Sequence, residues 1–188
     1  MARPSVRPQL LDAAARRVAE GGLEELTLDQ VAADAGVSKG GLLYHFPTKA
    51  DLIEALIRDV LRRFEDTVER ASAGSDAPGT WTRAYIDATF DAEVSRPALA
   101  TALLASPEVG TDLARTCART FADWQRSLVA DGIDAGTAAT IRFACDGWWT
   151  LSSLTGDGDD DAELLRARLH DLADEAVSSR WTGTGARP

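Results

Sequence analysis

The chain has 188 residues, of which 45% are hydrophobic, and carries a formal net charge of −10. This size and apolar content allow a buried core in one compact body or in two small domains. The start, MARPSVRPQLL, lacks the apolar core of a secretory signal, and no apolar run approaches the roughly 20 residues of a membrane span. We therefore expect a soluble, cytoplasmic protein with no membrane partner. Cys117 and Cys145 are too few for a disulfide scaffold and lack the spacing of a metal site.

Apolar residues at helical spacing predict a first helix from about Ser5 to Gly21. The glycine pair Gly21-Gly22 ends this helix. Its inner face holds Val6, Leu10, Ala14 and Val18. A first helix of this length, ending on glycine, precedes the most informative segment of the chain.

The segment from Thr27 to Lys49, TLDQVAADAGVSKGGLLYHFPTK, predicts a helix, a three-residue turn and a short second helix. Thr27 and Ser38 can cap the two helices, and Gly36 supplies the left-handed backbone that a tight helix exit needs. The side chains expected to anchor the pair inward are Leu28, Val31, Ala32, Val37, Leu42 and Phe46. The polar edge that remains is typical of a helix-turn-helix that reads DNA.

The distribution of charge is compatible with this interpretation. Both lysines of the chain, Lys39 and Lys49, lie in the helix-turn-helix segment. Residues 1–50 carry six basic and six acidic side chains, whereas residues 51–188 carry 14 and 24, so the whole net charge of −10 belongs to the second part. An acidic body repels DNA and leaves the helix-turn-helix as the surface that can approach it.

From Thr27 to Leu52 the sequence resembles the DNA-binding half of the TetR (tetracycline-repressor-like) family of bacterial transcriptional regulators. The resemblance covers about 26 residues, or about 50 with the preceding helix, and its apolar, glycine and capping positions all agree. It implies an all-helical homodimer in which residues 1–50 bind DNA. Residues 51–188 then bind a small-molecule effector, form the dimer and change the spacing of two DNA-reading heads. The implied function is a ligand-responsive regulator, usually a repressor, on a palindromic double-stranded DNA operator.

By this resemblance and by helix geometry, Thr27, Tyr44, His45 and Lys49 are expected to contact phosphates. Lys39, the backbone of two adjacent glycines and Leu43 are expected to face base edges. The complete expected DNA-binding set is Thr27, Ser38, Lys39, Gly40, Gly41, Leu43, Tyr44, His45 and Lys49. The glycine pair should weaken the reading helix and leave its groove-facing surface flat.

Thr48 is expected to cap a long fourth helix that ends near the turn-rich stretch Ala73–Pro78. In all, the chain predicts about nine helices and no strands, arranged as a three-helix DNA-binding domain and a C-terminal bundle. The long fourth helix starts at the DNA face and ends in the second domain. It is therefore the expected lever between effector and DNA.

Aromatic residues of the second domain share helical faces and could line an effector pocket. The expected pocket residues are Trp81, Tyr85, Cys117, Thr120, Trp124, Cys145, Asp146 and Trp148. Core packing is the competing interpretation, because pockets and cores use the same residue types. Asp146 follows Arg142 by four residues, so its carboxylate either serves a ligand, pairs with Arg142 or makes a dimer contact.

Two C-terminal helices are expected to form the dimer, one from about Asp134 to Leu154 and one from Ala162 to Val177. The first is apolar on nearly all sides and the second carries a narrow apolar stripe. The expected interface residues are Trp149, Leu165, Leu169, Leu172 and Ala176. Packing within one subunit is the alternative for the stripe, and the family resemblance favours pairing across a two-fold axis.

No cofactor or metal is expected. The acidic loop Gly156–Asp161 lacks the residue order and closing Glu of a calcium loop. An enzyme is the alternative from another functional class, but the sequence has no nucleophile elbow, phosphate loop, metal-ligand cluster or paired His and carboxylate motif. A further alternative is an architectural DNA binder without an effector, which a closed cavity with buried polar groups would argue against.

Overall fold

The computed structural model describes residues 6–91, 110–155 and 159–182, whose backbone forms eight helices and no strand. The helices are α1 (Arg7–Gly21), α2 (Leu28–Asp34), α3 (Lys39–His45), α4 (Lys49–Ser72), α5 (Thr80–Phe90), α7 (Thr111–Ala130), α8 (Ala135–Thr155) and α9 (Asp159–Thr182). The predicted all-helical fold class is confirmed, with eight helices in the described ranges against about nine predicted. No helix in these ranges is both long and apolar enough to cross a lipid bilayer.

Local side-chain chemistry sets the helix boundaries of the N-terminal domain. Thr27 Oγ1 accepts a hydrogen bond from the Gln30 N–H at 3.3 Å and so caps α2. Thr48 and Asp51 form a capping box at the start of α4, each side chain accepting from the other residue's backbone N–H. After α2 the chain turns through Gly36, whose φ of +65° is left-handed. These boundaries agree with the sequence-based prediction.

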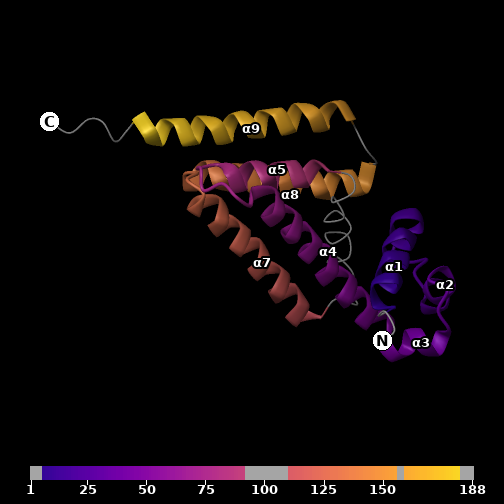
Figure 1. Ribbon diagram of the computed structural model, residues 1–188. Coiled ribbons are helices and arrows are strands. Elements are labelled where there is room, and N and C mark those ends of the chain that lie inside the picture. The colour runs from indigo at the N-terminus through magenta and orange to yellow at the C-terminus, as the bar shows by residue number, and fades with distance from the viewer. Residues whose placement is uncertain (1–5, 92–109, 156–158, 183–188) are drawn as a thin grey trace.

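In the N-terminal domain α1 packs on α4, and α2 packs on both α1 and α3 (Figure 1). The buried side chains that fill this domain are Leu10, Leu11, Ala14, Leu26, Val31, Leu42, Phe46, Leu52, Ile53, Leu56 and Ile57. Because α4 continues for 24 residues, its second half leaves the DNA-binding domain and enters the C-terminal bundle. One helix therefore belongs to the cores of both domains.

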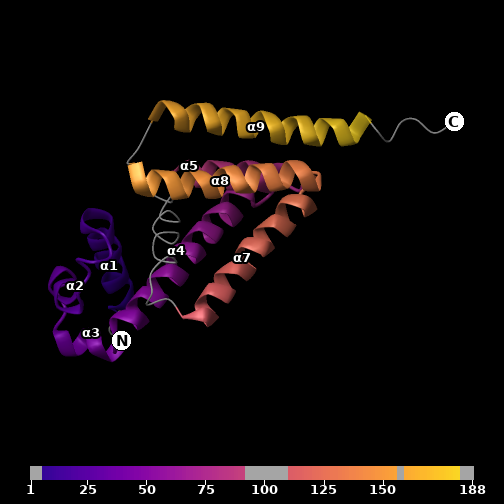
Figure 2. The ribbon, with the colours of Figure 1, turned by 180° about the vertical axis from the view of Figure 1, so that it is seen from behind.

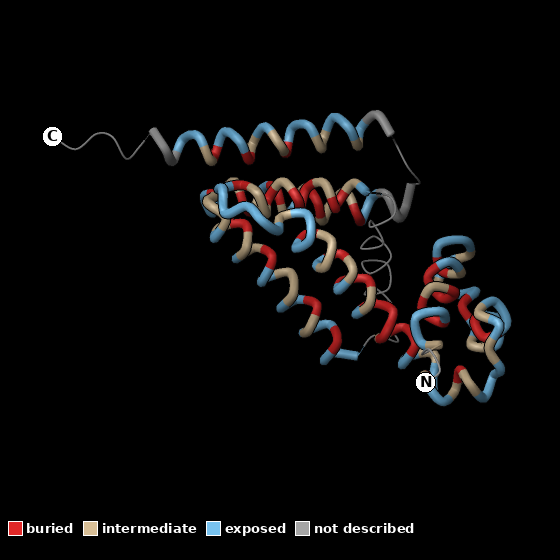
Figure 3. Tube along the Cα trace, in the orientation of Figure 1, coloured by how far each residue is buried: buried red, intermediate tan, exposed pale blue. Residues whose placement is uncertain are grey.

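The C-terminal bundle is layered. Figures 1 and 2 show α9 lying across α5 and α8, with α4 and α7 running obliquely on the other side of that pair. Figure 3 shows that α9 buries the side facing α5 and α8 and exposes the opposite side. The N-terminal domain therefore lies at one end of α4 (Figure 1), and Phe64, farther along the same helix, contacts aromatic rings of the bundle.

Candidate DNA-binding and effector sites

The short helix α3 presents one anchored face and one free face. Ser38 Oγ accepts a hydrogen bond from the Gly41 N–H at 3.1 Å and caps the helix. Leu42 is fully buried and anchors α3 on the domain core. Gly40 and Tyr44 lie on the side of α3 opposite Leu42, and Tyr44 is 84% exposed although it is a large aromatic residue. Lys39, in the first turn of the helix, is also exposed. An exposed aromatic side chain and an exposed lysine on a capped helix suit a reading helix.

The two glycines of α3 have different surroundings. A Cβ added to Gly40 would meet nothing within 4 Å, so this position faces open space. A Cβ added to Gly41 would lie 2.9 Å from Val37 Cγ1 and 3.3 Å from Ser38 Oγ. Gly41 is therefore needed for the close approach of α3 to the preceding turn. Only Gly40 leaves the outer surface of the helix flat, whereas the sequence interpretation gave this role to both glycines.

Lys39 forms an ion pair that sequence reasoning missed. Its Nζ lies 2.8 Å from Asp29 Oδ1 and donates to Asp29 Oδ2 at 3.0 Å. Asp29 is in the first turn of α2, and the side chains of both partners are more than half exposed. The lysine expected at a base edge is thus held by a carboxylate on the neighbouring helix. The ten-residue separation hides this pair from any helical-spacing pattern.

The residues expected at phosphates are spread around the start of α2 and the junction between α3 and α4. Thr27 is exposed, and its hydroxyl donates to Gln30 Oε1 at 2.7 Å. Lys49 is half-buried, and its Nζ donates to the Leu23 carbonyl oxygen at 3.0 Å, which ties α4 to the loop after α1. His45 is half-buried and makes an edge-to-face contact with Tyr44, with ring centroids 5.2 Å apart. Leu43 is half-buried against the core.

In the second domain the predicted aromatic residues gather around Phe64, a residue of α4 that the sequence analysis did not single out. Its ring centroid lies 5.4 Å from that of Tyr85, 4.9 Å from that of Trp124 and 5.2 Å from that of Trp149. Trp81 stacks on Tyr85 at 5.4 Å, as their shared face predicted. We call Phe64, Trp81, Tyr85, Trp124 and Trp149 the aromatic cluster. It joins α4 to α5, α7 and α8.

Three buried polar atoms in or beside the aromatic cluster have no hydrogen-bond partner among the residues that the structure describes: Tyr85 Oη, Trp124 Nε1 and Asp146 Oδ1. The other oxygen of Asp146 accepts from Arg142 Nη1 at 2.8 Å, so the predicted pairing with Arg142 is present. Burial raises the pKa of Asp146 despite this pair, and it raises the pKa of Tyr85 well above its ordinary value. Buried polar atoms without partners are costly, and such groups often mark a site for a ligand or water.

The remaining expected pocket residues are distributed around this centre. Cys117 and Cys145 are buried, and burial raises the pKa of Cys145 to about 12, so its thiol stays protonated at neutral pH. Thr120 is half-buried and donates to the Thr116 carbonyl oxygen. Trp148 is also half-buried and lies 5.4 Å from Phe90, outside the aromatic cluster. A separate surface hollow of about 340 Å³ between α4, α5 and α9 contains none of the expected pocket residues.

The two adjacent tryptophans of α8 differ in burial. Trp149, which is expected at the dimer interface, is 1% exposed within one subunit, and its Nε1 donates to the Thr89 carbonyl oxygen at 3.4 Å. It continues the buried face of Ile141 and Cys145 at four-residue spacing, and Trp148 is displaced from that face. The placement of Trp149 at a dimer interface stays a prediction.

The apolar stripe of α9 packs inside its own subunit. Leu169 is 1% and Ala176 is 7% exposed, and Leu165 and Leu172 are half-buried against the same core. This side of α9 faces α5 and α8 (Figure 3). Leu169 and Ala176 are thus covered by their own subunit, whereas the half-buried Leu165 and Leu172 keep some exposed surface, and the interface stays a prediction. Among the residues of α8 and α9 whose side chains the structure describes, the exposed large apolar ones are Phe143, Leu151 and Leu164.

No group of three His, Cys, Asp or Glu side chains that could hold a metal occurs in the described ranges. Residues 156–158 of the acidic loop lie outside those ranges. The first side chain after the gap with a described exposure is Asp161, on α9, and it is exposed.

Comparisons with known proteins agree with this geometry. The model of bacterial regulatory proteins of the tetR family matches residues 10–56, and the model of the tetracyclin repressor-like C-terminal domain matches residues 79–174. The chain is 32% identical over 189 residues to the HTH-type transcriptional regulator BetI of Burkholderia mallei (strain NCTC 10229), covering 93% of this chain and 94% of that protein.

Solved structures show the same fold. A TetR-family member from Streptomyces coelicolor A3 aligns with a TM-score of 0.66 and 28% identity over 90% of this chain and 99% of the other. The multidrug binding protein EbrR complexed with malachite green aligns with a TM-score of 0.63 and 28% identity, again over 90% and 99%. The family models together span both the DNA-reading helices and the aromatic bundle. This chain therefore belongs to the TetR family of bacterial regulators, as a DNA-binding transcriptional regulator.

Proposed function

We propose that this protein is a ligand-responsive repressor that binds a palindromic operator as a homodimer. Residues 1–50 are the DNA-binding unit in this proposal, and residues 51–188 bind the effector and form the dimer. The observation that carries it is the exposed face of α3, where Gly40 and the 84% exposed Tyr44 lie opposite the anchoring Leu42. An exposed face without bulky packing partners on a rigid, capped helix suits the major groove.

The effector proposal is supported by the aromatic cluster. Its rings supply apolar surface, and three unpartnered buried polar atoms lie among or beside them, on Tyr85, Trp124 and Asp146. A molecule with an aromatic or apolar body and a hydrogen-bonding group would match both features. EbrR, which resembles this chain over most of its length, has been solved with malachite green and with ethidium. Its capacity for such molecules supports an effector of this general type.

The dimer proposal relies on apolar residues that remain exposed on one subunit. Phe143 is 63% and Leu151 is 59% exposed, and the two are eight residues apart on α8. Leu164 on α9 is 70% exposed. Exposed large apolar side chains on the two terminal helices favour pairing with a second copy of the chain.

The test begins with selection of DNA by the purified protein from a pool of random duplexes. We expect enrichment of an inverted repeat, with half-sites spaced by about one helical turn or a multiple of it. The double variant Phe143→Ser/Leu151→Ser should be monomeric by analytical ultracentrifugation and should lose most of its affinity for the selected duplex. Selection of no sequence, or of a single half-site by a monomer, would contradict the proposal.

The proposed response to an effector is tested separately. Binding of malachite green and ethidium is followed through tryptophan fluorescence, and binding of the selected duplex is then measured at saturation. Typical coupling between sites would weaken operator binding about 5- to 150-fold. Quenching of the tryptophan fluorescence with unchanged DNA affinity would show that the protein binds the molecule but that this binding does not control DNA binding. Strong DNA bending with no sequence selection would instead identify an architectural DNA binder.

A further inference from the structure

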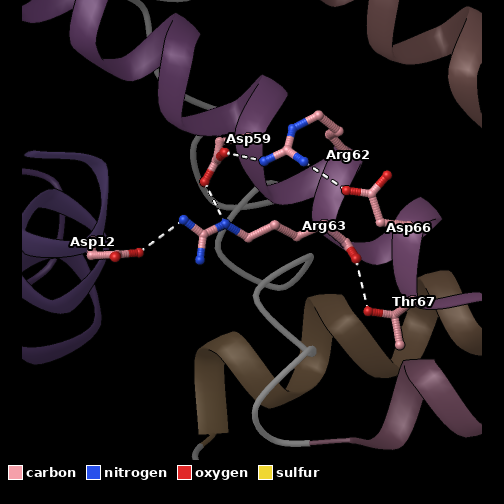
Figure 4. A network of polar contacts seen from close by, with 6 residues as sticks. All are labelled: Asp12, Asp59, Arg62, Arg63, Asp66 and Thr67. Carbon is pink, nitrogen blue, oxygen red and sulfur yellow. Dashed lines mark hydrogen bonds and ion pairs between the residues drawn. The ribbon is translucent and has the colours of Figure 1, made fainter. Parts of the chain in front are cut away.

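Arg63 connects the DNA-binding domain to α4 through its side chain. Its Nη2 donates to Asp12 Oδ1 on α1 at 2.9 Å, and its Nε donates to Asp59 Oδ2 on α4 at 2.6 Å (Figure 4). Asp12 and Arg63 are 51 residues apart in the chain, and each side chain is 39% exposed. The guanidinium is thus fixed on α4 by one carboxylate while it holds a second carboxylate on α1.

The neighbouring residue makes a different set of contacts. Arg62 binds Asp59 at 2.8 Å and Asp66 at 2.6 Å, and in Figure 4 both partners lie on α4 itself. Arg62 and Arg63 therefore share the acceptor Asp59, whose side chain is only 12% exposed. Each arginine can be removed while the other still neutralises Asp59. This makes Arg62 a control for Arg63 on the same turn of the same helix.

The Asp12–Arg63 pair lies far from the start of α4, where even a small rotation of the DNA-binding domain would displace its atoms. Apolar residues of α1 and of the first half of α4 share one core, and apolar attraction is non-directional, so it tolerates small rotations of one helix on the other. Arg63 lies 14 residues beyond Lys49, or about 21 Å along α4 at 1.5 Å per residue. A slip of about 1 Å at the ion pair then corresponds to a rotation of roughly 3° about the start of α4.

We propose that Arg63 is a positioning residue for DNA binding. Its ion pair with Asp12 holds the DNA-binding domain at the angle to α4 that operator binding needs, and the movement driven by the effector has to loosen this pair. The inference rests on the proposed function for its consequence on DNA, but the angle itself is a property of the free protein. A half-exposed ion pair shifts an equilibrium only about 1.4- to 5-fold, which is weak enough for an effector to overcome.

The angle is tested in the free protein by distances between spin labels at Glu24→Cys and Ser178→Cys. Both positions are exposed, the first after α1 and the second on α9, and the native cysteines are buried. Labelled chains are diluted with unlabelled chains so that distances within one subunit dominate. We expect Arg63→Gln to broaden or shift the distance distribution, and Arg62→Gln to leave it as in the parent. Asp12→Asn should reproduce the effect of Arg63→Gln, and the double variant should add nothing further.

A distribution for Arg63→Gln that matches the parent would overturn the proposal, and so would an equal broadening by Arg62→Gln. If Arg63→Gln fails to fold, Asp12→Asn removes the same pair from the exposed side of α1 and decides the question. These measurements need neither DNA nor effector. Their failure is therefore distinct from failure of the proposed function, which would appear as absence of sequence selection by the parent protein.

The consequence for DNA is measured on the duplex selected by the parent protein. With one pair lost from each of two heads, Arg63→Gln should weaken binding about 2- to 25-fold, and Arg62→Gln should not. The dependence of affinity on salt should be unchanged, because a positioning residue neutralises no phosphate. A salt slope reduced by about one per subunit would show instead that Arg63 contacts DNA directly, which would overturn its positioning role.

Discussion

Replacing each glycine of α3 by alanine should separate stability from DNA binding. At Gly40 an added methyl group would enter open space, whereas at Gly41 it would lie 2.9 Å from Val37 Cγ1. Both substitutions favour the helix, because alanine has a lower conformational cost than glycine in a helical segment. Only Gly41→Ala also forces a close contact with a β-branched side chain, whose χ1 is stiff.

The expected changes in the free energy of unfolding follow from helix propensity and from the contact with Val37. Gly40→Ala should stabilise the fold by about 0.5–1 kcal/mol, which corresponds to roughly 1–4 °C in melting temperature for a chain of this size. For Gly41→Ala the same gain is set against an overpacking cost of about 1–3 kcal/mol. The net result at Gly41 is a loss of up to about 2.5 kcal/mol. The two alanine variants should therefore shift the melting temperature in opposite directions.

At Gly40 we expect DNA affinity and stability to change in opposite directions. If the backbone of α3 approaches the base edges closely, the methyl group of Gly40→Ala stands in that path and weakens binding to the selected duplex while the fold gains stability. Thermal unfolding and fluorescence anisotropy with labelled duplex check the two quantities on the same samples. A destabilised Gly40→Ala, or one that binds DNA as tightly as the parent, would refute the reasoning about this helix.

Three other outcomes are expected. Asp29→Asn removes the carboxylate that holds the Lys39 ammonium. Affinity for random duplex should therefore rise more than affinity for the selected duplex, when both are measured over the same series of salt concentrations. Tyr85→Phe removes a buried hydroxyl that has no partner, so the free energy of unfolding in urea should fall by less than about 1 kcal/mol or rise. Burial opposes ionisation of Asp87, but hydrogen bonds from Arg166 and His170 outweigh it and hold the pKa of Asp87 below its usual value. Asp87 thus stabilises the fold above its unfolded pKa, and the benefit is lost as the pH falls through the folded pKa. Asp87→Asn should therefore destabilise the protein at pH 7 and approach the parent in stability as the pH falls below the folded pKa.

The helix boundaries around the DNA-reading segment could be predicted because each depends on a few neighbouring residues. Thr27, Ser38 and Thr48 each accept a hydrogen bond from the N–H three residues later, and such contacts are visible as short sequence patterns. The turn at Gly36 is of the same kind, since its left-handed backbone favours glycine locally. Local chemistry of this type survives in almost any tertiary setting.

In the C-terminal domain the sequence signal was one of burial alone, so it could not assign side chains to a core or to an interface. On α8, apolar residues on nearly all sides left the inner face undetermined, and a shift of one residue, about 100° around the helix, exchanged Trp148 for Trp149. On α9, the stripe through Leu169 and Ala176 correctly indicated a buried face. Periodicity cannot tell whether a buried face is covered by the same chain or by a second copy. Here α5 and α8 cover it.

Adjacent residues of α4 show how the two domains can be coupled although no sequence pattern links them. Phe64 contacts the aromatic cluster, and Arg63, one residue earlier and about 100° around the helix, holds Asp12 of the DNA-binding domain. Because α4 is one continuous helix, a ligand that repacks the rings around Phe64 cannot rotate or shift that turn without moving Arg63 as well. In the proposed switch, the buried contact transmits the movement and the half-exposed ion pair is the weaker element that yields. A tightly packed ring on one face and a weak, directional contact on the next would then link effector to DNA within a single helical turn.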